Sequence, residues 1–94
     1  MLGFAMRAGK LVIGSDLVCR AMARGEARLI VLTSDSSPST KKRIRLKAEH
    51  YGISVTEPKI TGDELGKLLG KTYAPATVAV TDEGFATEIK KASI

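Results

Sequence analysis

The stretch "ARLIVLT" (residues 27–33) contains an uninterrupted run of large apolar side chains. Such a run predicts a β-strand that is covered on both faces, because a strand with one wet face would alternate apolar and polar residues. Three further stretches predict strands by their composition, namely "KLVIG" (10–14), "ISVTE" (53–57) and "ATVAVTD" (76–82). The central run therefore indicates a sheet with other elements packed on both of its sides.

Helical patterns separate the predicted strands. "LGFAMRAG" (2–9) predicts a first helix, and "GSDLVCRAMARG" (14–25) predicts a second helix with Gly25 as its C-terminal stop. Ser37 followed by Pro38 predicts the start of a third helix, because serine caps helix N-termini and proline fits the first helical position. Helices and strands thus alternate from the beginning of the chain.

The third helix is expected to run to about Tyr51 and to stop at Gly52. The residues expected to face the core from this helix are Ile44, Ala48 and Tyr51. Thr61 and Glu64 have the spacing of a capping box and predict the start of a fourth helix, while Asp82 predicts the cap of a fifth. The apolar residues that follow these caps are Leu65, Leu68 and Leu69 in the fourth helix, and Phe85 and Ile89 in the fifth.

The alternation predicts an α/β fold, a three-layer α/β/α sandwich with a central four-stranded mixed sheet. Ninety-four residues suffice for one domain with a modest core and are too few for two. No linker-like, repetitive or low-complexity segment interrupts the sequence. We therefore expect a single domain over residues 1–94.

The charge is distributed unevenly along the chain. The net charge is +5, of which residues 1–50 contribute +6 and residues 51–94 contribute −1. A one-sided basic balance favours a polyanionic partner, of which nucleic acid is the most common. Neither an apolar span of about 18 residues nor a signal-peptide pattern occurs, so we expect a soluble cytoplasmic protein without a membrane partner.

The sequence contains no catalytic constellation. His50 is the lone histidine, and Cys19 is the lone cysteine, which excludes an internal disulfide and a multi-cysteine zinc site. The adjacent acids at 63–64 and 82–83 are explained by helix starts, and the glycine spacings match neither a Walker loop nor a dinucleotide fingerprint. We predict that the protein is not an enzyme and needs no cofactor or metal.

The segment "KKRIRLK" (41–47) distributes five cations around one predicted helix. They cannot all face one ligand, because neighbouring positions on a helix point in different directions. The sequence leaves two interpretations open, a solvated basic face and direct contact with a polyanion.

Several stretches in this order resemble the kink-turn RNA-binding ribosomal-protein family, in particular its small bacterial YlxQ-type members. They are "LGFAMRAGKLVIGSDLVCRAMARGEARLIVLTSDSSPSTKKRI" (2–44), "EHYGISV" (49–55), "DELGKLLGK" (63–71) and "ATVAVTDEGFA" (76–86). The resemblance covers essentially the whole chain. It implies an α/β/α sandwich that binds RNA duplexes bent at a small bulge beside sheared G·A pairs.

The resemblance also assigns roles to residues. It places Gly14, Ser15, Asp16 and Leu17 at the family's G-x-N-E segment, where the second helix enters the groove beside the G·A pairs. Asp16 replaces asparagine, so it can accept hydrogen bonds from guanine but cannot donate them, and Leu17 replaces a polar glutamate. Asp16, Arg20 and Arg24 recur every four residues and so form one stripe on the predicted helix, for which a surface ion pair between Asp16 and Arg20 is the alternative interpretation.

The family's bulge-covering loop corresponds to residues 71–76. Tyr73 is expected either to stack on an extruded base or to pack against its own core, and Ala74 and Pro75 are expected to cover the bulge. Arg20 corresponds to a basic residue one helical turn after the G-x-N-E segment, suited to a phosphate or a guanine edge. Further candidates for phosphate contacts are Arg7, Lys10, Arg24, Arg28 and Lys41.

We therefore expect a monomeric, non-enzymatic protein that binds kink-turn or related bent RNA, in the first place ribosomal RNA. Ribosomal proteins are possible further partners. One alternative is a ribosome-associated protein-binding module with the same fold that has lost kink-turn recognition, for which the apolar Leu17 at a helix start would be a contact. Another is an RNA-recognition domain of the kind appended to RNA methyltransferases.

Overall fold

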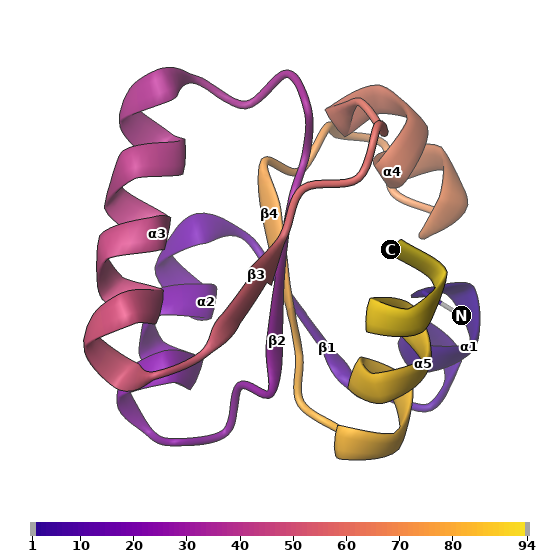
Figure 1. Cartoon of the computed structure of the whole chain (residues 1–94). Helices are drawn as coiled ribbons and strands as arrows, with labels where there is room; N and C mark the ends of the chain where they lie inside the picture. Colours follow the sequence, from indigo (N-terminus) through magenta and orange to yellow (C-terminus); the bar gives the residue numbers. More distant parts are fainter. Residues whose placement is uncertain (1, 94) are drawn as a thin grey trace.

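The computed structural model describes residues 2–93, so the two ends of the predicted domain, Met1 and Ile94, lie outside the described residues. Helices and strands alternate throughout this range, as predicted (Figure 1). The elements are α1 (Leu2–Arg7), β1 (Leu11–Ile13), α2 (Ser15–Ala23), β2 (Leu29–Leu32), α3 (Pro38–Tyr51), β3 (Ser54–Thr56), α4 (Gly62–Leu68), β4 (Thr77–Val80) and α5 (Glu83–Ser93).

The four strands form one mixed sheet in the order β1-β4-β2-β3. Strand β4 is antiparallel to both of its neighbours, β1 and β2, whereas β2 and β3 are parallel. Strands β1, β2 and β3 consequently all run in one direction and β4 runs in the other. The prediction of a four-stranded mixed sheet is confirmed.

Strand β2 lies inside the sheet and is covered on both sides. Its four residues are fully buried, and they alternate between two apolar clusters. Ile30 and Leu32 pack with α2 and α3, while Leu29 and Val31 pack with α4 and α5. A strand that is buried on both faces requires a continuous apolar run.

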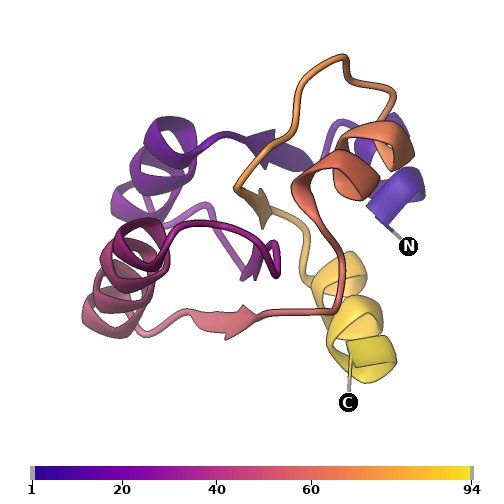
Figure 2. The same cartoon turned by 90° about the horizontal axis from the view of Figure 1, so that it is seen from above.

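The helices divide between the two faces of the sheet, as the view from above shows (Figure 2). Helices α2 and α3 cover one face, and α1, α4 and α5 cover the other. Each side has its own apolar cluster, so the sheet separates two thin cores. The three-layer sandwich predicted from the sequence is confirmed.

Local signals set most helix ends. The Ser37 hydroxyl accepts a hydrogen bond from the backbone N–H of Thr40 at 3.2 Å, and Pro38 occupies the first turn of α3. Thr61 and Glu64 form the predicted capping box of α4. The Asp82 carboxylate accepts from a backbone N–H in the first turn of α5 at 3.0 Å. Each cap satisfies a donor that the helix itself leaves unpaired.

One apolar residue predicted to face the core, Tyr51, is instead exposed, and Leu68 in α4 is exposed as well. Tyr51, the last residue of α3, is 43% exposed, and its ring contacts that of His50 with 4.8 Å between centroids. Ile53 packs instead against the apolar cluster between the sheet and helices α2 and α3. Leu68 is 52% exposed, whereas Leu65 and Leu69 are buried.

Candidate functional site

Four segments meet at one end of the sheet. The N–H of Gly14 donates to the carbonyl of Thr77 and the N–H of Thr33 donates to that of Ala76, both at 3.1 Å, and the N–H of Ser34 donates to a carbonyl in the β3–α4 connection at 2.8 Å. We call this the Gly14 end, where β1, β2 and β3 stop and β4 begins. The start of α2, the loop at 33–37, the loop at 57–61 and the loop at 69–76 therefore adjoin one another.

Helix α2 begins at this end without a side-chain cap. Gly14 has a φ of 105° and a ψ of 143°, a conformation that residues with a side chain rarely adopt, and no atom would obstruct a Cβ there. Glycine is thus required here by the backbone rather than by crowding. Ser15, half-buried, is the first helical residue, and its backbone N–H lies in the turn whose donors have no helical acceptor.

Asp16 pairs with a cation from the neighbouring helix. Nη2 of Arg43 in α3 donates to Oδ1 of Asp16 at 3.2 Å, and the hydrogen bond to Asp16 raises the pKa of Arg43 above its ordinary value. The predicted pair between Asp16 and Arg20 is thus replaced by a pair between two helices. Arg20 is exposed and has no ion-pair partner among the residues that the structure describes.

The loop before β4 is held close to α4 by two glycines one helical turn apart. A Cβ on Gly66 would collide with the backbone carbonyl oxygen of Tyr73, and a Cβ on Gly62 would lie 3.1 Å from both the Cβ of Ala74 and the carbonyl oxygen of Pro75. Sequence reasoning missed both glycines, although their spacing of four in "GDELG" places them on one helix face. The close approach fixes the path of the loop.

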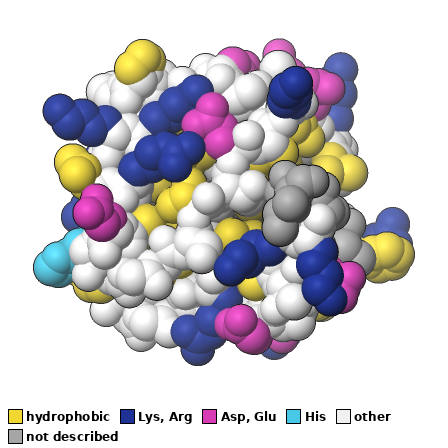
Figure 3. Space-filling view, in the orientation of Figure 1, with side chains coloured by type: hydrophobic (Ala, Val, Ile, Leu, Met, Phe, Trp, Pro, Cys, Tyr) yellow, Lys and Arg dark blue, Asp and Glu magenta, His cyan; other side chains and the backbone are white. Residues whose placement is uncertain are grey.

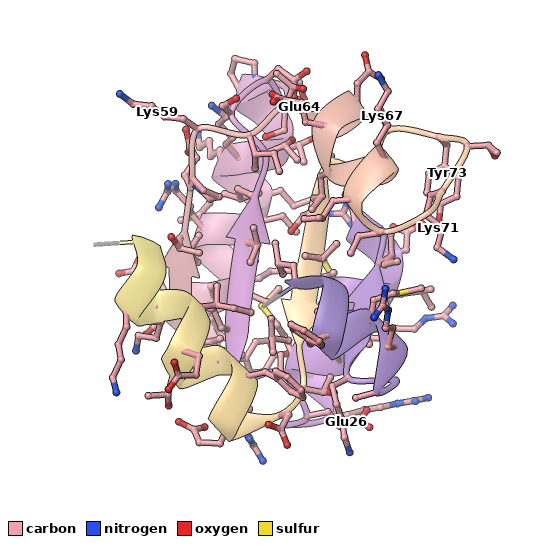
Figure 4. All side chains as sticks on the ribbon, turned by 90° about the vertical axis from the view of Figure 1, so that its right-hand side faces the viewer. Glu26, Lys59, Glu64, Lys67, Lys71 and Tyr73 are labelled. Atoms are coloured by element: carbon pink, nitrogen blue, oxygen red, sulfur yellow. The ribbon has the colours of Figure 1, made fainter. Side chains whose placement is uncertain are left out.

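The loop presents its side chains unequally. Tyr73 is 55% exposed and lies on the outer curve of the loop in Figure 4, so it does not pack against the core. Ala74 is exposed as well. Pro75, by contrast, is buried against α4 and offers less surface to a bound nucleotide than Tyr73 or Ala74. Its ring lies next to Gly66 and supports the loop instead.

The loop at 33–37 serves as a platform between the other segments. The Asp35 carboxylate accepts from the N–H of Gly62 at 2.8 Å, and the hydroxyl of Ser34 donates to the carbonyl of Ile60 at 3.1 Å. The Thr33 hydroxyl donates to the carbonyl of Ala76 at 3.1 Å. These polar residues were not singled out in the sequence, because the hydrogen bonds join positions 26 or more residues apart.

The candidate cations do not all lie at this site. Arg20 and Arg24 are exposed along one stripe of α2 that begins at Asp16. Lys10 and Arg28 lie at the opposite end of the sheet, which we call the Arg28 end, where Lys10 accepts a backbone hydrogen bond from Thr81. The stripe on α2 therefore begins at the Gly14 end with Asp16 and ends with the C-cap Arg24 towards the Arg28 end, where Lys10 and Arg28 also lie.

Three candidate cations are engaged by other groups. Nζ of Lys41 donates to the carbonyl of Ser34 and to the carboxylate of Glu57, both at 3.0 Å, so its charge is committed within the protein. Arg28 donates to the carbonyl of Gly25 at 3.0 Å and lies 4.0 Å from the carboxylate of Glu83. Arg7 belongs to α1 on the other face of the sheet, with its guanidinium 6.0 Å from the ring centroid of Phe4.

Charge divides the two faces of the molecule. Within the described residues, α2 with its C-cap Arg24 and α3 carry seven cations and two anions. The described parts of α1, α4 and α5 carry four of each. Dark blue side chains gather over α3 in Figure 3. Almost the entire excess of positive charge thus lies on the α2–α3 face, which also bears the start of α2.

Other kinds of site find less support. A hollow of about 410 Å³ at the Arg28 end is lined by Arg28, Tyr51, Ser54, Glu83 and Lys90 among others, far from the Gly14 end. Residues 2–93 contain no group of three His, Cys, Asp or Glu side chains that could hold a metal ion. No described helix combines the length and the apolar character needed to cross a membrane.

Comparison with known proteins gives a consistent result. The profile of the ribosomal protein L7Ae/L30e/S12e/Gadd45 family matches residues 1–90. The chain is 38% identical to the RNA-binding protein YlxQ of Bacillus subtilis over 89 residues, which cover 95% of this chain and 87% of that protein. It is 32% identical to the large ribosomal subunit protein eL30 of Methanocaldococcus jannaschii over 85% of this chain and 73% of that protein.

A solved structure also matches closely. A protein of unknown function from Bacillus halodurans superposes with a TM-score of 0.90 at 32% identity, covering 96% of this chain and 89% of that one. Sequence and structure comparisons thus agree along nearly the whole chain. The family resemblance read from the sequence is confirmed.

Proposed function

The chain belongs to the ribosomal protein L7Ae/L30e/S12e/Gadd45 family, and on this premise we propose that it is a non-enzymatic protein that binds kink-turn or related bent RNA through its Gly14 end. The proposed ligand is ribosomal RNA, and the whole chain acts as one RNA-binding domain in the cytoplasm. The observation that carries the proposal is that the uncapped start of α2, on the basic side of the sheet, adjoins the loop before β4, which carries an exposed tyrosine.

The start of α2 supplies the polar part of the proposed interface. Gly14 allows RNA to approach the backbone closely, and the free N–H groups of the first turn favour a negatively charged group. Asp16 accepts hydrogen bonds from guanine, while Arg43 offsets the repulsion between its carboxylate and nearby phosphates. Arg20 and Arg24 contact the phosphate backbone along the same stripe of α2.

The loop before β4 supplies the apolar part. Tyr73 stacks on an unpaired base of the bulge, a contact that binds bases with little sequence preference. Ala74 lies beside it and Leu17, which is 51% exposed, extends the apolar area on α2. Gly62 and Gly66 determine where the tyrosine stands, because they let the loop approach α4.

A titration by gel shift or fluorescence anisotropy tests the proposal. We expect the protein to bind a standard kink-turn duplex more tightly than a duplex in which the sheared G·A pairs are replaced by Watson–Crick pairs. The variant Asp16→Ala should weaken binding to the kink-turn alone, whereas Arg20→Ala, which removes a phosphate contact, should weaken binding to both RNAs. Equal affinity for the two RNAs would contradict specific recognition and leave general electrostatic attraction.

A protein-binding module with the same fold is the second candidate, since Leu17 is a large apolar side chain exposed at a helix start. Under this alternative, Asp16→Ala and Arg20→Ala would leave RNA affinity unchanged. The substitution Leu17→Ser would then reduce co-purification of ribosomal proteins without altering RNA binding. The two sets of variants therefore separate the candidates.

A further inference from the structure

We propose that the outer surfaces of α2 and α3 together bind the phosphate backbone of an RNA stem that continues beyond the bend. This α2–α3 basic surface consists of Arg20 and Arg24 on α2 and of Arg43 and Lys47 on α3. The inference rests on the proposed function and extends it, because it adds a helix outside the segment at the start of α2.

Four of the five cations of "KKRIRLK" separate into two groups in the structure, and the fifth, Lys42, is exposed. Lys41 and Arg45 each bind one oxygen of Glu57, at 3.0 Å and 2.9 Å, and they lower the pKa of this carboxyl group. Both are thus occupied on the side of α3 that faces β3. Arg43 points the other way, to α2, and Lys47 follows it by four residues, on the same side of the helix.

Helices α2 and α3 bring these cations into two adjacent rows. The two helices pack against each other, and both run from the Gly14 end to the Arg28 end because each follows a strand of the same direction. The ion pair between Asp16 and Arg43 shows that these two residues stand at the same height along the two helix axes. One turn further, about 6 Å along both axes, come Arg20 and Lys47, and Arg24 follows after another turn.

The charges of this surface are available to a ligand. In the described part of the chain, the side chains of Arg20, Arg24 and Lys47 have no hydrogen-bond or ion-pair partner, and the Arg43 side chain uses one of its five donors for Asp16. The helices on the other face carry as many anions as cations. A polyanion is therefore attracted to this side of the sheet.

Continuity with the Gly14 end favours RNA over an acidic protein as the occupant. The two rows begin at Asp16 in the first turn of α2, where the proposed interface with the bend lies. A stem leaving the bend along α2 meets Arg20 first, and then the cations of both rows. For an acidic protein, nothing would require its binding surface to continue from the Gly14 end.

The test compares kink-turn RNAs whose stems are either just long enough to form the bend or extended by one helical turn, each stem being lengthened separately. The variant Lys47→Gln breaks no ion pair seen in the structure, and Arg43→Gln/Lys47→Gln removes both of the α3 cations that belong to the α2–α3 basic surface. Lys90→Gln/Lys91→Gln in α5 is the matched control on the other face. Thermal melting verifies that each variant is folded.

With one extended stem, we expect the double α3 variant to lose roughly tenfold in affinity and the slope of log K against log salt to fall by about 1–2. The single Lys47→Gln variant should lower the slope by about 1, and the α5 control should change neither quantity. The short-stem RNA should show a much smaller loss with Lys47→Gln.

Equal losses on short and extended stems would overturn the inference, because the α3 cations would then act at the bend alone. Unchanged RNA binding in every α3 variant would also overturn it and point to a protein ligand. Extended RNAs lacking the G·A pairs distinguish this failure from failure of the proposed function. If wild-type protein binds them as tightly as the kink-turn, recognition of the bend fails, whereas the loss caused by Lys47→Gln still reports on the stem contact.

Discussion

The two faces of the sheet resemble each other inside and differ outside. Each side buries its own cluster of aliphatic side chains, with alternate residues of β2 contributing to each. On the outside, α2 and α3 hold seven cations against two anions, while the described residues of α1, α4 and α5 are balanced at four each. The difference shows that burial determines the fold, whereas the outward positions are left free to select a partner.

The largest effect is expected on the free energy of unfolding when a buried residue of either apolar cluster is truncated, because the two faces of the sheet are equivalent in this respect. Leu29 and Leu32 are fully buried in β2 and belong to opposite clusters. Each change to alanine should lower the free energy of unfolding by about 2–5 kcal/mol through lost apolar burial and the cavity that remains. Urea unfolding measures both variants. If one cost less than half of the other, the two cores would not contribute equally.

The next effect concerns the outer surfaces and should appear on one face only. We expect Arg20→Ala to weaken RNA binding by about 1–3 kcal/mol, because an exposed cation on the α2 stripe is lost. Lys67→Ala, on α4 of the balanced face, is the control and should leave RNA affinity unchanged. Equal losses in the two variants would mean that net charge rather than its location governs binding.

A pair of exposed tyrosines separates the Gly14 end from the basic face as a whole. Tyr73 lies at the Gly14 end, whereas Tyr51 lies at the end of α3 on the basic face. Tyr73→Ala should weaken kink-turn binding by about 1–2 kcal/mol through loss of stacking. Tyr51→Ala should have no effect in the same titration. A loss with Tyr51→Ala instead would move the base contact to the other end of the molecule.

The smallest effect concerns the cations that bind within the protein. Lys41 and Arg45 lower the pKa of Glu57 below its ordinary value, so the ionised carboxylate is favoured in the folded state. This stabilisation is present above the ordinary pKa and is lost as the pH falls through the lowered value. We therefore expect Glu57→Gln to reduce stability at pH 7 by no more than about 1 kcal/mol, since the ion pairs are partly exposed.

The pH dependence of unfolding checks this last prediction. The difference between wild type and Glu57→Gln should be largest at neutral pH and should shrink as the pH falls through the acidic range. High salt should also reduce it, because exposed ion pairs are screened. A difference that stays constant with pH would show that packing, rather than charge, accounts for the effect.

Local signals made most elements readable from the sequence. The run in β2, the caps at Ser37 and Thr61 and the stops at Gly25 and Gly52 each depend on residues within a few positions of one another. Periodicity was a poorer guide at helix ends. Tyr51 and Leu68 continue an apolar pattern, but both stand where a helix ends, and neither is buried.

The candidate site was partly readable. The sequence pointed to Gly14 and Asp16 through the family resemblance, and the structure sets both at the start of α2. It did not reveal that Arg43 holds Asp16, because these residues are 27 positions apart. Nor did it reveal that Pro75 is buried, which depends on how closely α4 approaches the loop at Gly66.

By itself, then, the sequence determined the kinds and order of the elements, the two-sided burial of β2 and the surplus of positive charge. Those properties depend on neighbouring residues or on composition. Only the tertiary structure decided which charges share a surface. It separates Lys10 and Arg28 from the Gly14 end and engages Lys41 with Glu57. Pairing between strands distant in the sequence determines these placements, and no local pattern encodes that pairing.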